Sequence, residues 1–189
     1  MSSLLLACAH VPTPSAAPSL TTLDGAPINF AAELGTHDAT VVVFFSTSCP
    51  CVARYERRVE ALSAAYAARG VRVVYVSSNA DDDARALRSA LQARAIQLPL
   101  WVDWSGALAA QLEARTTPTV VVLDRSGAVK FRGWVDNERD VGERDRTPWL
   151  ERALDSMLSG APVDVAASPT FGCRITQAFG SPRVCPTLQ

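Results

Sequence analysis

Lysine, histidine and long apolar runs are scarce in this sequence, and these absences exclude several classes of function. The 18 Lys and Arg residues are scattered among 19 Asp and Glu, for a formal net charge of −1, and Lys130 is the single lysine. The chain therefore offers no basic face, and we expect no nucleic-acid partner. No stretch reaches the roughly 18 apolar residues of a membrane span. Nothing indicates a zinc site, a phosphate-binding loop or a serine–histidine–aspartate arrangement, and we expect neither a metal nor a cofactor.

The composition is that of a globular chain, and its pattern divides it into three parts. With 189 residues, 48% of them apolar and 20% charged, the chain is long enough to form one well-buried core. We expect residues 20–160 to form this domain. A signal-like segment with a Pro/Ser/Ala linker at residues 1–19 precedes it, and an irregular, cysteine-containing tail at residues 161–189 follows it.

The segment Ser3–Cys8 is a short apolar run that ends in a small residue and a cysteine. It resembles a bacterial lipoprotein signal box with Cys8 as the lipidated residue. Two features oppose this interpretation: no Lys or Arg precedes the run, and an apolar signal region normally has roughly 7–15 residues. Either the true start lies upstream of Met1 or the match is accidental. The box and the five cysteines favour an extracytoplasmic location, periplasmic or membrane-anchored, and leave a cytoplasmic one open.

The most informative stretch joins a strand to a helix at a cysteine–proline pair. Five large apolar residues, Val41–Phe45, predict a strand that is buried on both faces. Pro50 suits the first turn of a helix, where a missing N–H costs nothing, and an apolar stripe from Val52 to Tyr66 continues that helix. Cys49 therefore lies at a helix N-terminus. The free N–H groups and the helix dipole there stabilise a thiolate relative to a thiol.

Downstream, strand patterns alternate with helix patterns. A strand at 71–76 completes a strand–helix–strand unit with parallel strands. Pro118 then opens a strongly apolar strand at 119–124, which turns back into a second strand at 128–134. The other predicted elements are a hairpin within 20–34, a helix at 84–91, an extended piece at 98–103, a short helix at 105–112, a solvated charged loop at 136–146 and a helix at 148–158.

Taken in order, these elements resemble the thioredoxin fold. Features typical of this fold are a buried strand, a Cys49-Pro50 pair, a long helix, and a Thr117-Pro118 pair that enters an antiparallel hairpin. The chain resembles the redoxin branch, meaning the AhpC/TSA and thioredoxin-like redoxin families, and Phe171–Ile175 is similar to a tail motif of some bacterial redoxin-like proteins. The resemblance implies an α/β, thioredoxin-like three-layer sandwich with a central mixed sheet flanked by helices.

The same resemblance implies a thiol–disulfide oxidoreductase that acts on a protein or small-molecule thiol or disulfide. Cys49 would attack the substrate sulfur as a thiolate and form a mixed disulfide, which a second cysteine resolves. Pro118 would follow a cis peptide bond, and the backbone of Thr117 would pair with the bound substrate beside Cys49. Cis bonds occur at only about 5–6% of X-Pro positions, so this expectation is specific.

Several positions depart from the patterns of related families. Thioredoxins place a second cysteine three residues after the first, whereas here that position is Val52 and the extra cysteine is Cys51. The peroxiredoxin motif places a threonine three residues before the nucleophile and a proline seven before it. This chain has Ser46 and Val42 at those positions, so thiol peroxidase activity is an alternative reading with weaker support.

The resolving cysteine has three candidates. Cys51 is nearest in sequence, but residues two apart point ~200° away from each other around a regular helix. Cys173 lies in a tail without an apolar period, which leaves it free to approach Cys49, and we favour it as the resolver. Cys185 comes last, and a disulfide between Cys173 and Cys185 that simply staples the tail is a further possibility.

Two other classes of function compete with the oxidoreductase. Cys49 and Cys51 supply two soft ligands suited to Cu(I), which would make the domain a copper-binding module. Both histidines, His10 and His37, precede the motif, and Met157 lies in the terminal helix, so no neighbouring ligand completes such a site. The third class is a redox-silent binding domain with structural cysteines, which rapid alkylation of Cys49 at neutral pH would exclude.

Overall fold

Strand β3 (Ala39–Phe45) is buried along its whole length, as its apolar run predicts. Because successive side chains of a strand point to opposite faces, its residues divide between two apolar clusters. Val41 and Val43 pack in the larger cluster, and Val42 and Phe44 pack in the smaller one on the other face. The strand is therefore the centre of a sheet that is covered on both sides.

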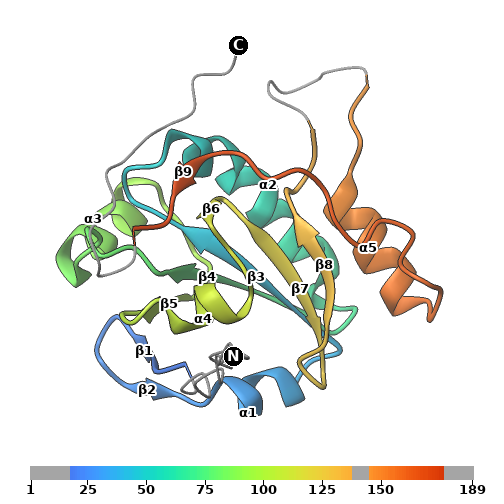
Figure 1. Ribbon diagram of the computed structural model, residues 1–189, viewed down its shortest axis with the longest axis horizontal. Helices are drawn as coiled ribbons and strands as arrows, with labels where there is room; N and C mark the ends of the chain where they lie inside the picture. Colours follow the sequence, from blue (N-terminus) through green and yellow to red (C-terminus); the bar gives the residue numbers. More distant parts are fainter. Residues whose placement is uncertain (1–17, 138–144, 177–189) are drawn as a thin grey trace, which may run out of the picture.

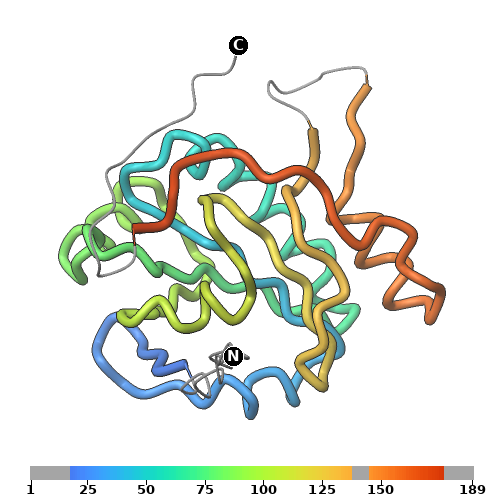
Figure 2. Tube along the Cα trace, in the orientation of Figure 1, coloured from blue at the N-terminus to red at the C-terminus, as the bar shows by residue number. Residues whose placement is uncertain are grey.

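The computed structural model describes residues 18–137 and 145–176. Besides β3, its strands are β1 (Leu20–Thr22), β2 (Pro27–Ile28), β4 (Val71–Ser77), β5 (Leu100–Asp103), β6 (Thr116–Thr117), β7 (Val120–Asp124), β8 (Val129–Gly133) and β9 (Cys173–Arg174). The helices are α1 (Phe30–Gly35), α2 (Pro50–Ala67), α3 (Ala84–Ala93), α4 (Ala107–Gln111) and α5 (Trp149–Leu158). Figures 1 and 2 show how the helices lie around the sheet.

Seven strands form one mixed sheet in the order β2-β1-β5-β4-β3-β7-β8 (Figure 1). The β3–β4 and β4–β5 pairs are parallel, and the other neighbours are antiparallel. Apolar residues of α2, α3 and α5 join the larger cluster on one face, while residues of α1 and α4 join the smaller cluster on the other. This arrangement confirms the predicted three-layer sandwich with a thioredoxin-like mixed sheet.

Between α5 and residue 176, the described part of the tail is irregular apart from β9, which pairs with β6 in a separate two-stranded sheet. It first runs beside β8, where the backbone N–H of Arg132 donates to the carbonyl of Ala166 at 3.0 Å. It then crosses the end of the main sheet toward β6. This part of the tail is the red segment in Figure 2. This path places Cys173 opposite Thr117 of β6.

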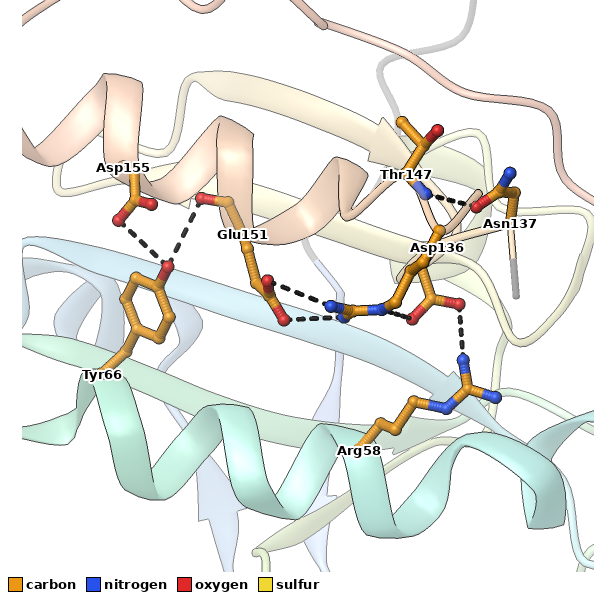
Figure 3. Close-up of polar contacts among 8 residues, drawn as sticks. Arg58, Tyr66, Asp136, Asn137, Thr147, Glu151 and Asp155 are labelled. Atoms are coloured by element: carbon orange, nitrogen blue, oxygen red, sulfur yellow. Dashed lines mark hydrogen bonds and ion pairs between the residues drawn. The ribbon is translucent and has the colours of Figure 1, made fainter. Parts of the chain in front are cut away.

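The prediction of a solvated loop at 136–146 is wrong for Asp136, whose side chain is 0% exposed. One carboxylate oxygen accepts a hydrogen bond from Arg58 of α2 at 2.6 Å (Figure 3). The other oxygen accepts from Arg146 at 3.0 Å. Arg146 also pairs with Glu151 of α5 at 2.8 Å. A buried carboxylate is tolerated when cations offset its desolvation, so these charges join α2, α5 and the end of β8 instead of facing water.

Candidate active site

Cys49 lies where the sequence predicts it, between the end of β3 and the start of α2. It is the N-cap residue of α2, with φ −88° and ψ 113°, and Pro50 follows as the first helical residue. The residue is only 1% exposed. A buried thiol at a helix N-terminus faces backbone N–H groups that have no partner inside the helix, which favours its ionised form.

The Thr117–Pro118 peptide bond is cis, as expected. It directs the carbonyl oxygen of Thr117 toward Cys49, whose Sγ donates a hydrogen bond to it at 3.0 Å. The prediction that the Thr117–Pro118 bond is cis and lies within contact distance of Cys49 is therefore confirmed. Thr117 is itself 0% exposed, so this strand end is covered by another part of the chain.

The covering segment is β9, which pairs with β6 in antiparallel register. The two strands lie side by side in Figure 1, and Thr117 faces Cys173 across the pair while Thr116 faces Arg174. The backbone N–H of Ile175 extends the pairing by donating to the carbonyl of Arg115 at 2.9 Å. The structure therefore brings together four residues that the sequence singles out, Cys49, Thr117, Pro118 and Cys173, although Cys173 is distant from the others in the chain.

The pKa of Cys49 is lowered from its ordinary value by these neighbours. Burial raises the pKa of the thiol, but hydrogen bonds from the side chains of Cys173 and Thr117 and from the backbone N–H groups of Cys173 and Val52 outweigh this effect. Hydrogen bonds donated to the charged form favour it, so the site stabilises a thiolate. Two of the four hydrogen bonds come from Cys173, which means that the docked tail contributes directly to ionisation of Cys49.

Cys51 occupies a different environment in the first turn of α2. It is half-buried and packs against the larger apolar cluster. Cys49, Cys51 and Cys173 are present as thiols and not as disulfides in this structure. The proposed competitor Cys185 and the candidate lipidation residue Cys8 lie outside the described residues.

Asp82 is a buried residue near the site whose role sequence reasoning missed. It follows β4, is 2% exposed, and accepts hydrogen bonds from the backbone N–H of Thr47 at 3.2 Å and from the Ser77 hydroxyl at 3.1 Å. The Thr47 hydroxyl also donates to it. The sequence indicates only a helix N-cap in this region, and Asp83 does fill that position. Asp82 instead fixes the loop that carries Cys49.

Asn79 links the end of β3 to the tail. Its amide nitrogen donates to the carbonyl of Phe45 at 2.9 Å, and its amide oxygen accepts from the backbone N–H of Thr176 at 3.2 Å. The carboxyl ends of neighbouring parallel strands meet at one edge of a sheet. That rule could have placed polar residues after β4 beside Cys49, although it could not have identified Thr176 as their partner.

The described residues contain no group of three or more His, Cys, Asp and Glu side chains placed to hold a metal ion. Within the same ranges, no helix is long and apolar enough to cross a membrane. The groups around the sulfur of Cys49 are a second thiol, a hydroxyl, and backbone N–H and carbonyl groups. Such a set suits exchange between thiols and disulfides.

The fold and this cysteine site define a thioredoxin-fold redox protein. The profile of the Redoxin family matches residues 11–147, and the chain belongs to that family. No curated protein matches the chain.

Two solved structures match this chain over most of its length. A hypothetical protein from Sinorhizobium meliloti is 27% identical with a TM-score of 0.75, and the match covers 88% of this chain and 94% of that one. An uncharacterized conserved protein from Geobacillus kaustophilus is 26% identical with a TM-score of 0.75, covering 88% and 92%. A secreted disulfide oxidoreductase from Mycobacterium tuberculosis is 20% identical with a TM-score of 0.54, covering 75% and 94%, and this likeness concerns the fold alone.

Proposed function

We propose that the protein is a thiol–disulfide oxidoreductase whose redox-active pair is Cys49 and Cys173. The observation that carries this proposal is the pairing of β6 with β9. It sets Cys173 opposite Thr117, whose carbonyl oxygen lies 3.0 Å from the sulfur of Cys49. Cys173 is also among the groups whose hydrogen bonding lowers the pKa of Cys49. Two cysteines held around the same residue, Thr117, at the end of a fixed sheet can form a disulfide without rearrangement of the core.

Reduction of a disulfide would proceed in two exchanges. The Cys49 thiolate attacks one sulfur of the substrate, a Cys49–substrate disulfide forms, and the other half of the substrate leaves as a thiolate. Cys173 then loses its proton and attacks the sulfur of Cys49. The Cys49–Cys173 disulfide forms, and the second half of the substrate leaves. The substrate gains two electrons and the protein loses two; two equivalents of an external thiol then reduce the Cys49–Cys173 disulfide and are themselves oxidised to a disulfide.

The lowered pKa of Cys49 supports its role as the attacking sulfur. A thiolate is the nucleophile in such exchange, so the lowered pKa raises the fraction of reactive sulfur at neutral pH. Cys49 is also the better leaving group when an external thiol attacks the internal disulfide at Cys173, because a thiol of low pKa leaves faster. The same property therefore supports both directions of exchange.

Disulfide mapping tests the pair. Full-length protein is oxidised without added reductant, digested under acid conditions that stop exchange, and analysed by mass spectrometry. We expect a peptide that links Cys49 to Cys173. A link from Cys173 to Cys185 would remove Cys173 from the mechanism, and a link from Cys49 to Cys51 would transfer its role to the first turn of α2.

A further inference from the structure

The strand β9 occupies the backbone edge that a polypeptide substrate would need in order to reach Cys49. An extended peptide binds an exposed strand by adding itself as a further strand, with main-chain hydrogen bonds supplying the affinity. The edge of β6 beside Cys49 already has this partner, since Thr116 and Thr117 pair with Arg174 and Cys173. Cys49, beside this strand pair, is 1% exposed.

The tail is fixed on both sides of Cys173. Before the cysteine, the ring of Phe171 packs edge-on against Trp134 at 5.3 Å between centroids, and the indole N–H of Trp134 donates to the carbonyl of Phe171 at 2.9 Å. After the cysteine, Ile175 is 6% exposed in the smaller apolar cluster. The carbonyl of Thr176 accepts from the backbone N–H of Ala80 at 2.6 Å. These contacts hold β9 as a built part of the site.

Gly172 allows the tail to lie directly on the cis peptide. Its φ is +128°, a value that L side chains rarely adopt, and an added Cβ would lie 2.0 Å from the carbonyl oxygen of Thr117. Any larger residue must therefore lift the tail from β6. The aromatic–glycine–cysteine order of the tail matches this need for anchorage and close approach.

From this geometry we propose that the docked strand closes the site to extended polypeptides and directs the Cys49–Cys173 pair to low-molecular-weight disulfides and thiols. This inference rests on the proposed function. A small sulfur compound requires no backbone edge, so it can approach Cys49 when the half-buried side chain of Cys173 turns aside while β9 stays paired. A polypeptide must instead displace the whole strand, which competes from within the same chain at an effective concentration on the order of millimolar.

Displacement of the tail would also weaken the nucleophile. The backbone N–H of Cys173 is one of the donors that favour the thiolate of Cys49, and it leaves together with β9. A substrate that strips the strand therefore meets a less ionised sulfur, whereas a small disulfide meets the site with this N–H in place. Both effects favour the small substrate.

The experiment compares two disulfides that share one leaving group. Reduced full-length protein is mixed with bis(2-hydroxyethyl) disulfide, or with an extended peptide whose central cysteine carries a mixed disulfide with 2-mercaptoethanol. The loss of the Cys49 thiol is followed by acid quenching and mass spectrometry. The quantity measured is the rate with the small disulfide divided by the rate with the peptide disulfide. It is measured for the wild type, for Gly172→Ala and for Gly35→Ala. Gly35→Ala is the control because nothing lies within 4 Å of a Cβ added at Gly35.

We expect the wild type and Gly35→Ala to react about tenfold or more faster with the small disulfide. In Gly172→Ala the ratio should fall toward one, because the tail no longer covers β6; changes in the reactivity of Cys49 itself cancel in the ratio. If this variant does not fold, Ile175→Ala replaces it, since it removes the apolar anchor of the tail.

A wild-type ratio near one overturns the inference by itself. Gly172→Ala gives a second way to overturn it. Rapid alkylation of Cys173 in the folded variant would show that the tail is released, and a rate ratio that nevertheless stays high would show that the tail is not the cause of the selectivity. A different result, in which neither disulfide yields a Cys49–Cys173 link, contradicts the proposed function instead. The products therefore separate the failure of one proposal from the failure of the other.

Discussion

The first turn of α2 and the strand β9 each bring a cysteine toward Cys49, but in different ways. Cys51 is close because the chain is short between the two residues, and its orientation is set by the helix that begins at Pro50. Cys173 is close because β9 pairs with β6, which sets it opposite Thr117 and beside the nucleophile. Within a helix, the spacing of two residues along the chain fixes both the distance between their side chains and the directions in which they point. In a strand pair, the register decides which residue faces the site.

This difference has an electrostatic consequence. Cys173 donates to the sulfur of Cys49 both through its thiol and through its backbone N–H, and both contacts lower the pKa of Cys49. The tail strand therefore supplies activation as well as a second sulfur. Changes to either cysteine, or to the docking of β9, should separate these two contributions.

The largest effect is expected for Cys49→Ser. A serine hydroxyl is not ionised near neutral pH and forms no disulfide, so turnover of bis(2-hydroxyethyl) disulfide with dithiothreitol should fall to the uncatalysed rate. Cys51→Ser provides the matched control because it removes a neighbouring thiol and leaves the nucleophile. Retained turnover in Cys49→Ser would show that another sulfur carries the reaction.

The next largest effect is expected for Cys173→Ser. Loss of the internal resolving thiol replaces an intramolecular step with attack by external thiol, and we expect turnover to fall about 100-fold. The first exchange survives, so each protein molecule should release one equivalent of 2-mercaptoethanol and retain a mixed disulfide on Cys49. Rapid turnover without this intermediate would mean that Cys51 resolves it.

The third effect concerns pH and should be smaller. Gly172→Ala lifts β9 and removes the two donors from Cys173, so the pKa of Cys49 should rise toward the ordinary value of about 8.5. Because a lowered pKa keeps the thiolate populated at lower pH, the variant should lose more alkylation rate at about pH 6 than at about pH 9. Iodoacetamide labelling across this range gives the two midpoints. Equal midpoints would show that β9 does not activate Cys49.

Local sequence patterns predict one half of the site well. The run Val41–Phe45 and Pro50 place Cys49 at a strand–helix junction, because burial and helix initiation depend on neighbouring residues. The Thr117–Pro118 turn also follows from its place before an apolar strand together with the family resemblance. These features depend on contacts that each segment makes largely by itself.

The other half of the site depends on pairing between distant segments. A strand of two residues such as β9 has too little pattern to predict its partner, and the sequence indicates only a tail in which Cys173 can move. The burial of Asp136 was missed for the same reason, since Arg58 and Arg146 come from separate elements. Charged residues in a loop are usually solvated, and only the assembled fold shows that two cations meet this one.

The smallest effect is expected for Cys51→Ser, which tests whether the cysteine in the first turn of α2 takes part in the exchange. Cys51 lies in the helical turn after Cys49, and a regular helix directs residues two apart ~200° away from each other. Formation of a Cys49–Cys51 disulfide would therefore distort the first turn of α2, whereas Cys173 needs no such change. Turnover of bis(2-hydroxyethyl) disulfide should stay within about twofold of the wild type, and the mapped link from Cys49 to Cys173 should persist. A loss comparable to that of Cys173→Ser would place Cys51 in the exchange pathway and make the helix turn, not the tail strand, the source of the resolving sulfur.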